Sequence, residues 1–462
     1  MKRECGSWKN GMKSKYGPRM PQMLYYFVIL SIGTIYFFLL GEAGPILSDD
    51  SHVFLGYINR TSNIYWLYSR FLYLFYLLFG ETCFLDAVYI LQAMLALVTS
   101  IILVEFFRKE YELNYYISTI IFFLTLLPYG YSLPESVVTH HILTEGLTFP
   151  IFHVYILTAY KLFLYEKKRY IIQGFFFSGI LVLLRSQSII FFLSFLLFVI
   201  FVLFKKQYCR VGNKKRFVSY TCLIICTLLG LGTSAFYMVL KTGELNQFSD
   251  AITGRVICIS QYEDCELFED ETKEVFLELY DNAKERGNLV DLSKTQRAEE
   301  IALKINENTK DWPSVISNYY NEKYDSLSNP DKMYKYRMRN AIVWELLEAH
   351  FGDYILLTMK LLPYSFVASI FIQPDAIYGL CHVIAMGIYI TAIMLAIYAK
   401  KRGCGTKYII PLVVTLSSIL INVVATNIMF YGQQRYVVYL FGVFYISVLL
   451  EIVSIWRSRI IK

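Results

Sequence analysis

Charged residues are scarce in this chain. Only 18% of its 462 residues are Asp, Glu, Lys or Arg, whereas 56% are hydrophobic. Typical soluble proteins carry about 25% charged residues, so the composition excludes an ordinary soluble enzyme. The net charge of +7 does not indicate nucleic-acid binding, because the basic residues stand mainly in short segments beside apolar runs, where they set membrane topology.

The familiar nucleotide-binding and hydrolase motifs are also missing. No P-loop, Rossmann glycine pattern, HExxH or GxSxG stands in a supporting context. The nine cysteines show no metal-ligand spacing, although Cys258 and Cys265 lie close together in a polar segment and leave a disulfide open. No internal repeat or low-complexity tract is visible, which argues against an inverted-repeat transporter.

Long apolar runs, in contrast, are abundant. A helix needs roughly 20 predominantly apolar residues to cross a bilayer. We therefore expect an all-α polytopic membrane protein with about ten transmembrane helices and both termini in the cytoplasm. The expected spans are 23–40, 86–104, 115–129, 142–164, 170–184, 189–204, 217–240, 376–399, 408–429 and 436–453.

Two further apolar segments fit poorly as spans. Segment 63–79 is short and holds Arg70, and segment 354–372 contains Lys360 and Pro363. If either crossed the bilayer, the basic cluster that follows it, 107–109 or 400–402, would lie outside, against the positive-inside rule. We expect the first to be a helix on the outer face and the second to be half-buried or re-entrant there.

One long polar segment interrupts the apolar chain. Residues 241–350 hold 14 Lys/Arg and 22 Asp/Glu. Their helical spacing predicts three helices, at 269–286, 292–306 and 331–350, which pack into a small extracytoplasmic cap. The chain then divides into an N-terminal transmembrane core (1–240), an extracytoplasmic helical loop (241–352) and a C-terminal part with a juxtamembrane segment and transmembrane helices (353–462).

Two adjacent carboxylates stand just after the first apolar run, in Ser48-Asp49-Asp50-Ser51-His52. Ser-Asp-Asp is a good helix N-cap signal, so the pair could cap a short loop helix. The alternative is that Asp49 and Asp50 form the catalytic end of a membrane enzyme. The polar groups that the expected topology brings to the same face favour this alternative.

The expected topology gathers charged and polar groups at the outer ends of the spans. They are Asp49, Asp50, His52, Glu135, His140, His141, Glu145, Arg185, Lys360 and Arg435. Charges beside apolar runs are functional hypotheses by default. Arg185 and Arg435 could instead be interface anchors, and Glu145 could pair with one of them structurally. Two adjacent histidines cannot easily face one ion, so we assign no metal ligands, and the need for a divalent cation stays open.

The order of these features resembles the GT-C superfamily of integral-membrane glycosyltransferases, most closely the protein O-mannosyltransferase and lipid A aminoarabinose transferase branch. The matching features are an Asp-Asp loop after the first span, Thr-Glu at the head of the fourth, Leu-Leu-Arg-Ser-Gln-Ser between the fifth and sixth, and Arg-Tyr opening the last. The resemblance implies a polyprenyl-phosphate sugar donor and a catalytic carboxylate at Asp49 or Asp50. It implies donor-phosphate binding by Arg435, Arg185 and Lys360; Glu145, His52 and His141 would support the site.

The expected function is sugar transfer to a hydroxyl of a glycan, lipid or protein acceptor outside the cytoplasm, in cell-envelope glycan or glycolipid modification at the plasma membrane. The expected partners are the lipid-linked donor, the acceptor and the bilayer, and no nucleic acid. A transporter or flippase for lipid-linked sugars is the first alternative, and a polymerase is the second. A flippase needs a polar path through the membrane, and segments 86–104, 189–204 and 217–240 carry almost no polar residues.

Overall fold

The computed structural model describes residues 21–39, 44–56, 66–131, 137–209, 250–324, 332–371, 378–429 and 437–460. Within these ranges the chain is helical, and its one extended pairing is an isolated bridge between Ile46 and His141. The expected all-α class is therefore confirmed for this part of the chain.

Six helices among the described residues are long and apolar enough to cross a membrane. They are Gln22–Leu39, Leu67–Glu110, Glu145–Tyr165, Gly379–Lys401, Thr406–Ile428 and Val438–Ser458, and two shorter apolar helices cover Tyr115–Gly130 and Ile189–Phe204. These are the features of a helical membrane protein. The expected number of ten spans is not confirmed, and the expected span at 217–240 lies outside the described residues.

The N-terminal half is built from helices that follow the predicted apolar runs. Its elements are α1 (Gln22–Thr34) with the π-helical turn η1 (Ile35–Leu39), α2 (Asp49–Leu55), α3 (Trp66–Glu110), α4 (Tyr115–Tyr131), η2 (Val138–His140), α5 (Glu145–Tyr165), α6 (Lys168–Leu184), η3 (Ser186–Ser188) and α7 (Ile189–Cys209). Their contacts form one large apolar core that is rich in aromatic rings and continues into the last helices of the chain.

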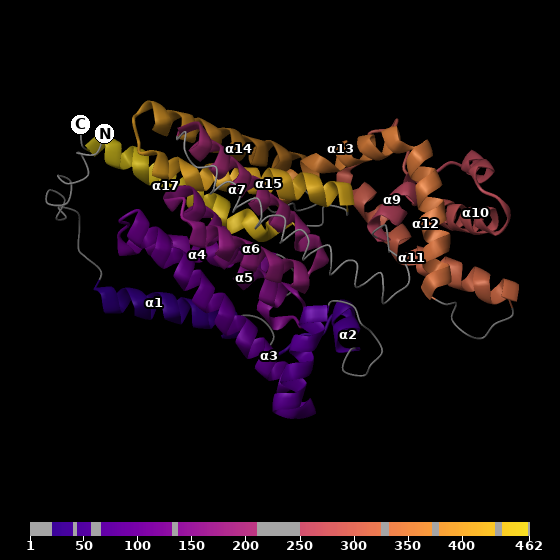
Figure 1. Cartoon of the computed structure of the whole chain (residues 1–462), viewed down its shortest axis with the longest axis horizontal. Helices are drawn as coiled ribbons and strands as arrows, with labels where there is room; N and C mark the ends of the chain where they lie inside the picture. The colour runs from indigo at the N-terminus through magenta and orange to yellow at the C-terminus, as the bar shows by residue number, and fades with distance from the viewer. Residues whose placement is uncertain are drawn as a thin grey trace.

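Helix α3 is broken at Gly80. This glycine has φ 71° and ψ 172°, a conformation that only glycine adopts readily, and it divides the 45-residue element into two helical arms. Figure 1 shows α3 turning back sharply at this break. The first arm begins at Trp66 and ends at Gly80, so it corresponds to segment 63–79, which was expected to be a helix distinct from the span at 86–104.

The polar segment forms a cap with an apolar core of its own. It consists of α9 (Asp250–Ile259), η4 (Tyr262–Leu267), α10 (Asp270–Glu285), α11 (Ala298–Tyr324) and α12 (Lys332–Ala349). Val275, Leu279 and Ala283, which the spacing placed on one helix face, are all buried. Gly254 lets α9 and α11 approach closely, because a Cβ there would lie 2.5 Å from the Ile305 carbonyl oxygen.

The C-terminal part returns the chain to the bundle through α13 (Phe351–Ala368), α14 (Tyr378–Lys401), α15 (Thr406–Met429), η6 (Val438–Leu440) and α17 (Phe441–Ile460). Helix α13 is not among the six candidate spans. Tyr354, Leu357 and Leu361 belong to the core of the cap, whereas Val367 and Ala368 belong to the core of the bundle. Helix α13 therefore joins the two.

The bundle helices lie roughly side by side along the long axis of the molecule, and the cap extends from one end (Figure 1). Helix α1 begins and α17 ends at the opposite end, while α2 lies toward the cap (Figure 1). At the far end Arg457 donates hydrogen bonds to the carbonyls of Tyr111 (2.8 Å) and Glu112 (2.7 Å). The loop that carries the aspartate pair is thus at the cap end of the bundle.

Candidate functional site

The first loop is tied to the segment that precedes α5. The Ile46 amide donates to the His140 carbonyl (2.8 Å), and the Ile142 amide donates to the Ile46 carbonyl (3.0 Å). Ser48 is the N-cap of α2, and its amide donates to Ser51 Oγ at 2.9 Å. Ser48 is therefore the N-cap of this short helix, and Asp49 and Asp50 are its first two residues; the side chains of the pair lie outside the described part of the chain.

A small apolar cluster links α2 through α3 to the ends of α5 and α6. Phe54 of α2 meets Tyr68 of α3 edge to face, with ring centroids 5.2 Å apart. Leu147, from the first turn of α5, and Leu184, the last residue of α6, belong to the same buried cluster. The aspartate-bearing helix packs on α3 and shares this cluster with the ends of α5 and α6 that adjoin Glu145 and Arg185.

Glu145 and Arg185 form an ion pair that is almost shielded from water. Their side chains are 4% and 8% exposed, and Arg185 Nη1 contacts Glu145 Oε1. Thr144 Oγ1 donates to Glu145 Oε2 (2.9 Å), and Arg185 Nε donates to Gln187 Oε1 (2.9 Å). The structural pairing weighed for Glu145 is thus confirmed, and each charge is balanced by the other.

A buried glutamine holds the neighbouring backbone in place. Gln92 accepts a hydrogen bond from Tyr68 Oη (3.1 Å) and donates to the carbonyls of Thr139 (3.0 Å) and His141 (3.1 Å). Gly146 leaves room for it, since a Cβ there would lie 2.4 Å from the Gln92 side chain. His141 is buried beside this network, whereas His52 is exposed on α2. Through these two carbonyls, Gln92 holds the backbone of the segment before α5 in place.

Arg185 also connects the N-terminal helices to the end of the chain. It lines a small pocket with Gln187, Ser188, Ile190, Phe191, Asn422, Thr426 and Tyr439. Asn422 and Thr426 lie on α15, and Tyr439 lies in η6 at the start of the last span. Arg435 lies outside the described residues, but Tyr439, four positions later, contributes to the pocket.

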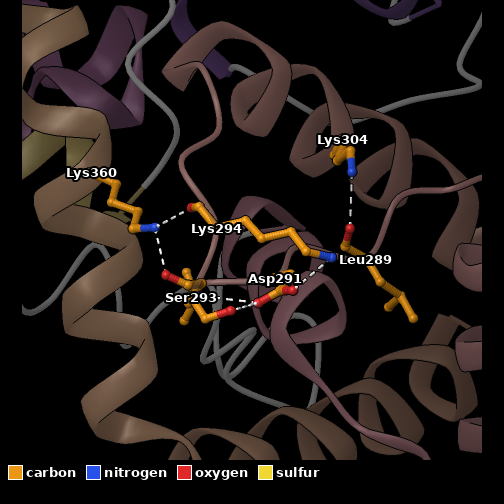
Figure 2. Close-up of polar contacts among 7 residues, drawn as sticks. Leu289, Asp291, Ser293, Lys294, Lys304 and Lys360 are labelled. Atoms are coloured by element: carbon orange, nitrogen blue, oxygen red, sulfur yellow. Dashed lines mark hydrogen bonds and ion pairs between the residues drawn. The ribbon is translucent and has the colours of Figure 1, made fainter.

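Lys360 is engaged elsewhere. Figure 2 shows its ammonium group donating to the carbonyls of Leu292 (2.6 Å) and Lys294 (3.0 Å), while Lys304 of α11 donates to Leu289 (2.9 Å). Within this loop Ser293 Oγ donates to Asp291 (2.6 Å), and its hydrogen bonds hold the pKa of Asp291 down at about 2. The partners of Lys360 belong to the cap loop, not to the Arg185 pocket, so its phosphate-binding role stays a prediction.

A buried arginine of the cap escaped the sequence interpretation. Arg255 of α9 is fully buried, donates from Nη1 to Thr358 Oγ1 (3.1 Å) and lies over the ring of Tyr354 with Cζ 5.4 Å from its centroid. Burial lowers the pKa of its guanidinium from the ordinary value, and Tyr354 partly offsets this effect. A charged residue inside the apolar run 251–259 was the signal that could have revealed it.

A polar stripe on α15 was also missed. Thr415, Ser418, Asn422 and Thr426 recur at helical spacing, and each is at most 2% exposed. Thr415 Oγ1 exchanges hydrogen bonds with Tyr160 Oη (2.7 Å) and with Ser447 Oγ of α17 (3.2 Å). One turn beyond Ser447, Glu451 is fully buried, and neither of its carboxylate oxygens has a hydrogen-bond partner among the described residues. The repeat at i, i+3, i+7 and i+11 was visible in the sequence.

The described residues contain no group of three or more His, Cys, Asp or Glu side chains that could hold a metal ion. Cys258 and Cys265 carry free thiols, and Asn308 Nδ2 donates to Cys258 Sγ at 3.2 Å. Burial raises the pKa of the Cys258 thiol to about 12. The disulfide that the sequence left open is not formed here.

The structure therefore brings together α2 with its aspartate pair, the Glu145–Arg185 ion pair, and a pocket that reaches α15 and η6. It directs the ammonium group of Lys360, from α13, to the cap loop and adds Arg255 at the contact between the cap and α13. No protein-family model, no curated protein and no solved structure matches the chain.

Proposed function

We propose that the chain is a membrane glycosyltransferase that moves a sugar from a polyprenyl-phosphate donor to an acceptor hydroxyl outside the cytoplasm. One observation carries the proposal. Helix α2, which begins with Asp49 and Asp50, shares a packed cluster with the helix ends beside Glu145 and Arg185, and Arg185 shares a pocket with the start of the last span. Acidic and basic groups of distant parts of the sequence thus occur at one end of the bundle.

The chemistry follows from these residue types. One of the two aspartates orients or deprotonates the acceptor hydroxyl, which attacks the anomeric carbon in line and inverts its configuration. The bond from this carbon to the phosphate oxygen breaks, and polyprenyl phosphate leaves. Guanidinium groups neutralise the charge that develops on the phosphate, an effect that is strong where water is excluded. Arg435 and Arg185 are the predicted donors for this role.

The surroundings of Arg185 add a constraint on that role. Because Glu145 already balances its charge, Arg185 meets a phosphate as half of a neutral pair. It then contributes directed N–H groups more than net charge. Glu145 and Gln187 hold the guanidinium in its orientation, and the backbone around His141, fixed by Gln92, holds the first loop beside them.

The test is sugar transfer by membranes that contain the full-length protein and a polyprenyl-phosphate sugar. Asp49→Asn and Asp50→Asn should leave expression and the thermal unfolding midpoint unchanged, and at least one should abolish transfer. Asp86→Asn is the matched control, because Asp86 is an exposed carboxylate of α3 outside the proposed site and should keep full activity. Full transfer by both single variants and by the double variant would end the catalytic assignment.

A second function is favoured by the stripe on α15. Thr426 and Asn422 line the Arg185 pocket, and Ser418 and Thr415 continue the buried polar face toward Ser447 and Glu451 of α17. Polar side chains inside a bundle mark substrate or ion pathways. Helix α15 lies outside segments 86–104, 189–204 and 217–240, whose lack of polar residues speaks against a flippase.

An assay in proteoliposomes distinguishes the transferase from the flippase. A flippase moves a fluorescent polyprenyl-phosphate sugar between leaflets without an acceptor, and Asn422→Leu should slow that movement, while Asp49→Asn should not. A transferase gives no acceptor-independent movement. Leu420→Ala, on an exposed position of the same helix, is the control for general damage to α15.

A further inference from the structure

The guanidinium of Arg255 is buried without a full set of partners. Its Nη1 donates to Thr358 Oγ1, but Nε and Nη2 have no hydrogen-bond partner within the described structure. A guanidinium carries five N–H donors, and a buried donor that is left unsatisfied is costly. A folded protein retains such an unsatisfied donor where the donor has another role, such as binding a ligand.

The charge of Arg255 is also unbalanced. Among the described residues no carboxylate forms an ion pair with it, whereas Arg339, the other fully buried arginine of the cap, pairs with Asp250 at 2.7 Å. Tyr354 adds a cation–π contact and a favourable interaction through its hydroxyl, but as a neutral side chain it does not balance the charge. A buried cation without a counter-charge is strongly unfavourable, so an anion at this position would relieve it.

The position of Arg255 connects it to the proposed site. Tyr354, which stacks on the guanidinium, donates from Oη to the carbonyl of Ile428 (2.5 Å) in the last turn of α15. Two residues earlier, Thr426 lines the Arg185 pocket. Figure 1 shows α9 beside the cap-side end of α15. Arg255 and the Arg185 pocket therefore adjoin the same helix end.

The unsatisfied atoms specify the kind of anion. Nε and Nη2 form the edge of the guanidinium that presents two parallel donors, the geometry that binds phosphate or carboxylate in a bidentate manner. Residues 241–350 carry 22 acidic and 14 basic residues, so the outer surface of the cap disfavours approach by a soluble anion. A phosphate on a membrane lipid arrives from the bundle side and avoids this field.

We propose that Arg255 binds the phosphate of the lipid-linked donor through its Nε–Nη2 edge, where α9, α13 and the end of α15 meet. The inference rests on the proposed function and makes Arg255 the main counter-charge for the phosphate, with Arg185 as a positioning residue that Glu145 neutralises. Because the guanidinium is buried, the phosphate enters as α13 shifts from α9 and Thr358 gives up its hydrogen bond.

The experiment measures ligand-induced thermal stabilisation of the purified full-length protein in detergent. The probes are farnesyl phosphate and, as a control, farnesol. The native protein should show a rise in Tm with the phosphate and none with the alcohol. Arg255→Met should lose this rise, and Arg255→Lys, which keeps the charge but not the bidentate edge, should bind at least tenfold more weakly. Arg286→Met, on an exposed arginine of the cap, should bind normally.

The design remains informative if the substitution changes folding. Without ligand, Arg255→Met should have an equal or higher Tm, because an unpaired buried charge is removed. A rise with farnesyl phosphate that is the same in native and Arg255→Met protein would overturn the inference. So would an Arg255-dependent rise with dioleoylphosphatidylglycerol alone, which would mark a bilayer-lipid site. Binding needs no sugar transfer, so an Arg255-dependent rise in a protein without transferase activity would sink the proposed function and leave this inference standing.

Discussion

Two buried arginines at the cap end of the molecule have opposite surroundings. Arg185, at the end of α6, is 7% exposed and is neutralised by Glu145 of α5. Arg255, in the cap, is fully buried and has Thr358 and Tyr354 as neighbours but no carboxylate among the described residues. The first belongs to an ion pair inside the bundle. The second retains its positive charge, so removing each residue should have opposite effects on stability.

The largest effect on stability is expected at the Glu145–Arg185 ion pair. Glu145→Gln removes the carboxylate that pairs with the buried Arg185 guanidinium and should lower the free energy of unfolding by about 3–5 kcal/mol. The double variant Glu145→Gln/Arg185→Met should recover most of the loss, because no charge remains buried. The measurement is the unfolding midpoint in detergent. Equal losses in the single and double variants would mean that the loss does not come from the Arg185 charge.

The opposite sign is expected at Arg255. Arg255→Met should leave stability unchanged or raise the free energy of unfolding by about 1 kcal/mol, because the methionine side chain fills similar space without a charge. The same unfolding assay, run beside Glu145→Gln, tests the contrast directly. A loss as large as that of Glu145→Gln would show that a counter-charge faces Arg255 in the folded protein.

A smaller loss is expected at Lys360, which tests whether this lysine belongs to the cap. Lys360→Met removes two hydrogen bonds to loop carbonyls and should cost about 1 kcal/mol, since the ammonium group is partly exposed. Hydrogen exchange should accelerate in the loop around Asp291. Slower sugar transfer with unchanged exchange would instead favour the predicted role of Lys360 at the donor phosphate.

A pH dependence confined to the cap is expected last, because it is absent at neutral pH. The pKa of the buried Cys258 thiol is raised from 9.0 to about 12. Its contribution to stability is therefore complete below pH 9 and is lost as pH rises toward 12, with a loss of roughly 1 kcal/mol by pH 10. Cys258→Ala should lack this component. Identical alkaline unfolding curves for the native protein and the variant would contradict the assignment.

The helices were predictable because apolar runs have a physical length requirement. The runs that begin at Met23, Ile189 and Tyr408 fold as helices near the expected bounds, and the separation of 63–79 from the next span coincides with Gly80. The expected number of ten spans is not confirmed, since six described helices are long and apolar enough to cross a membrane and two further apolar helices are shorter. The cap helices followed from the spacing of Val275, Leu279 and Ala283.

The site was less predictable because ion pairs depend on tertiary contacts. The sequence offered Glu145 and Arg185 as charges at span ends and left their pairing open, and the pair forms between α5 and α6. Lys360 was predicted to bind phosphate because it interrupts an apolar segment. In the structure its ammonium group donates to the carbonyls of Leu292 and Lys294, which lie more than sixty residues earlier in the chain. Arg255 was overlooked because its burial arises from α13, about a hundred residues later.

The break at Gly80 has a consequence for how the molecule meets a bilayer. Unbroken, 45 helical residues would extend about 68 Å, more than twice the roughly 30 Å of a hydrocarbon layer. The backbone conformation of Gly80 therefore divides a helix that would be too long into two arms, and the first arm places the ring of Tyr68 against Phe54 of α2. A substitution that straightened α3 at Gly80 would separate α2 from the first arm and displace the aspartate pair, without altering any charged residue.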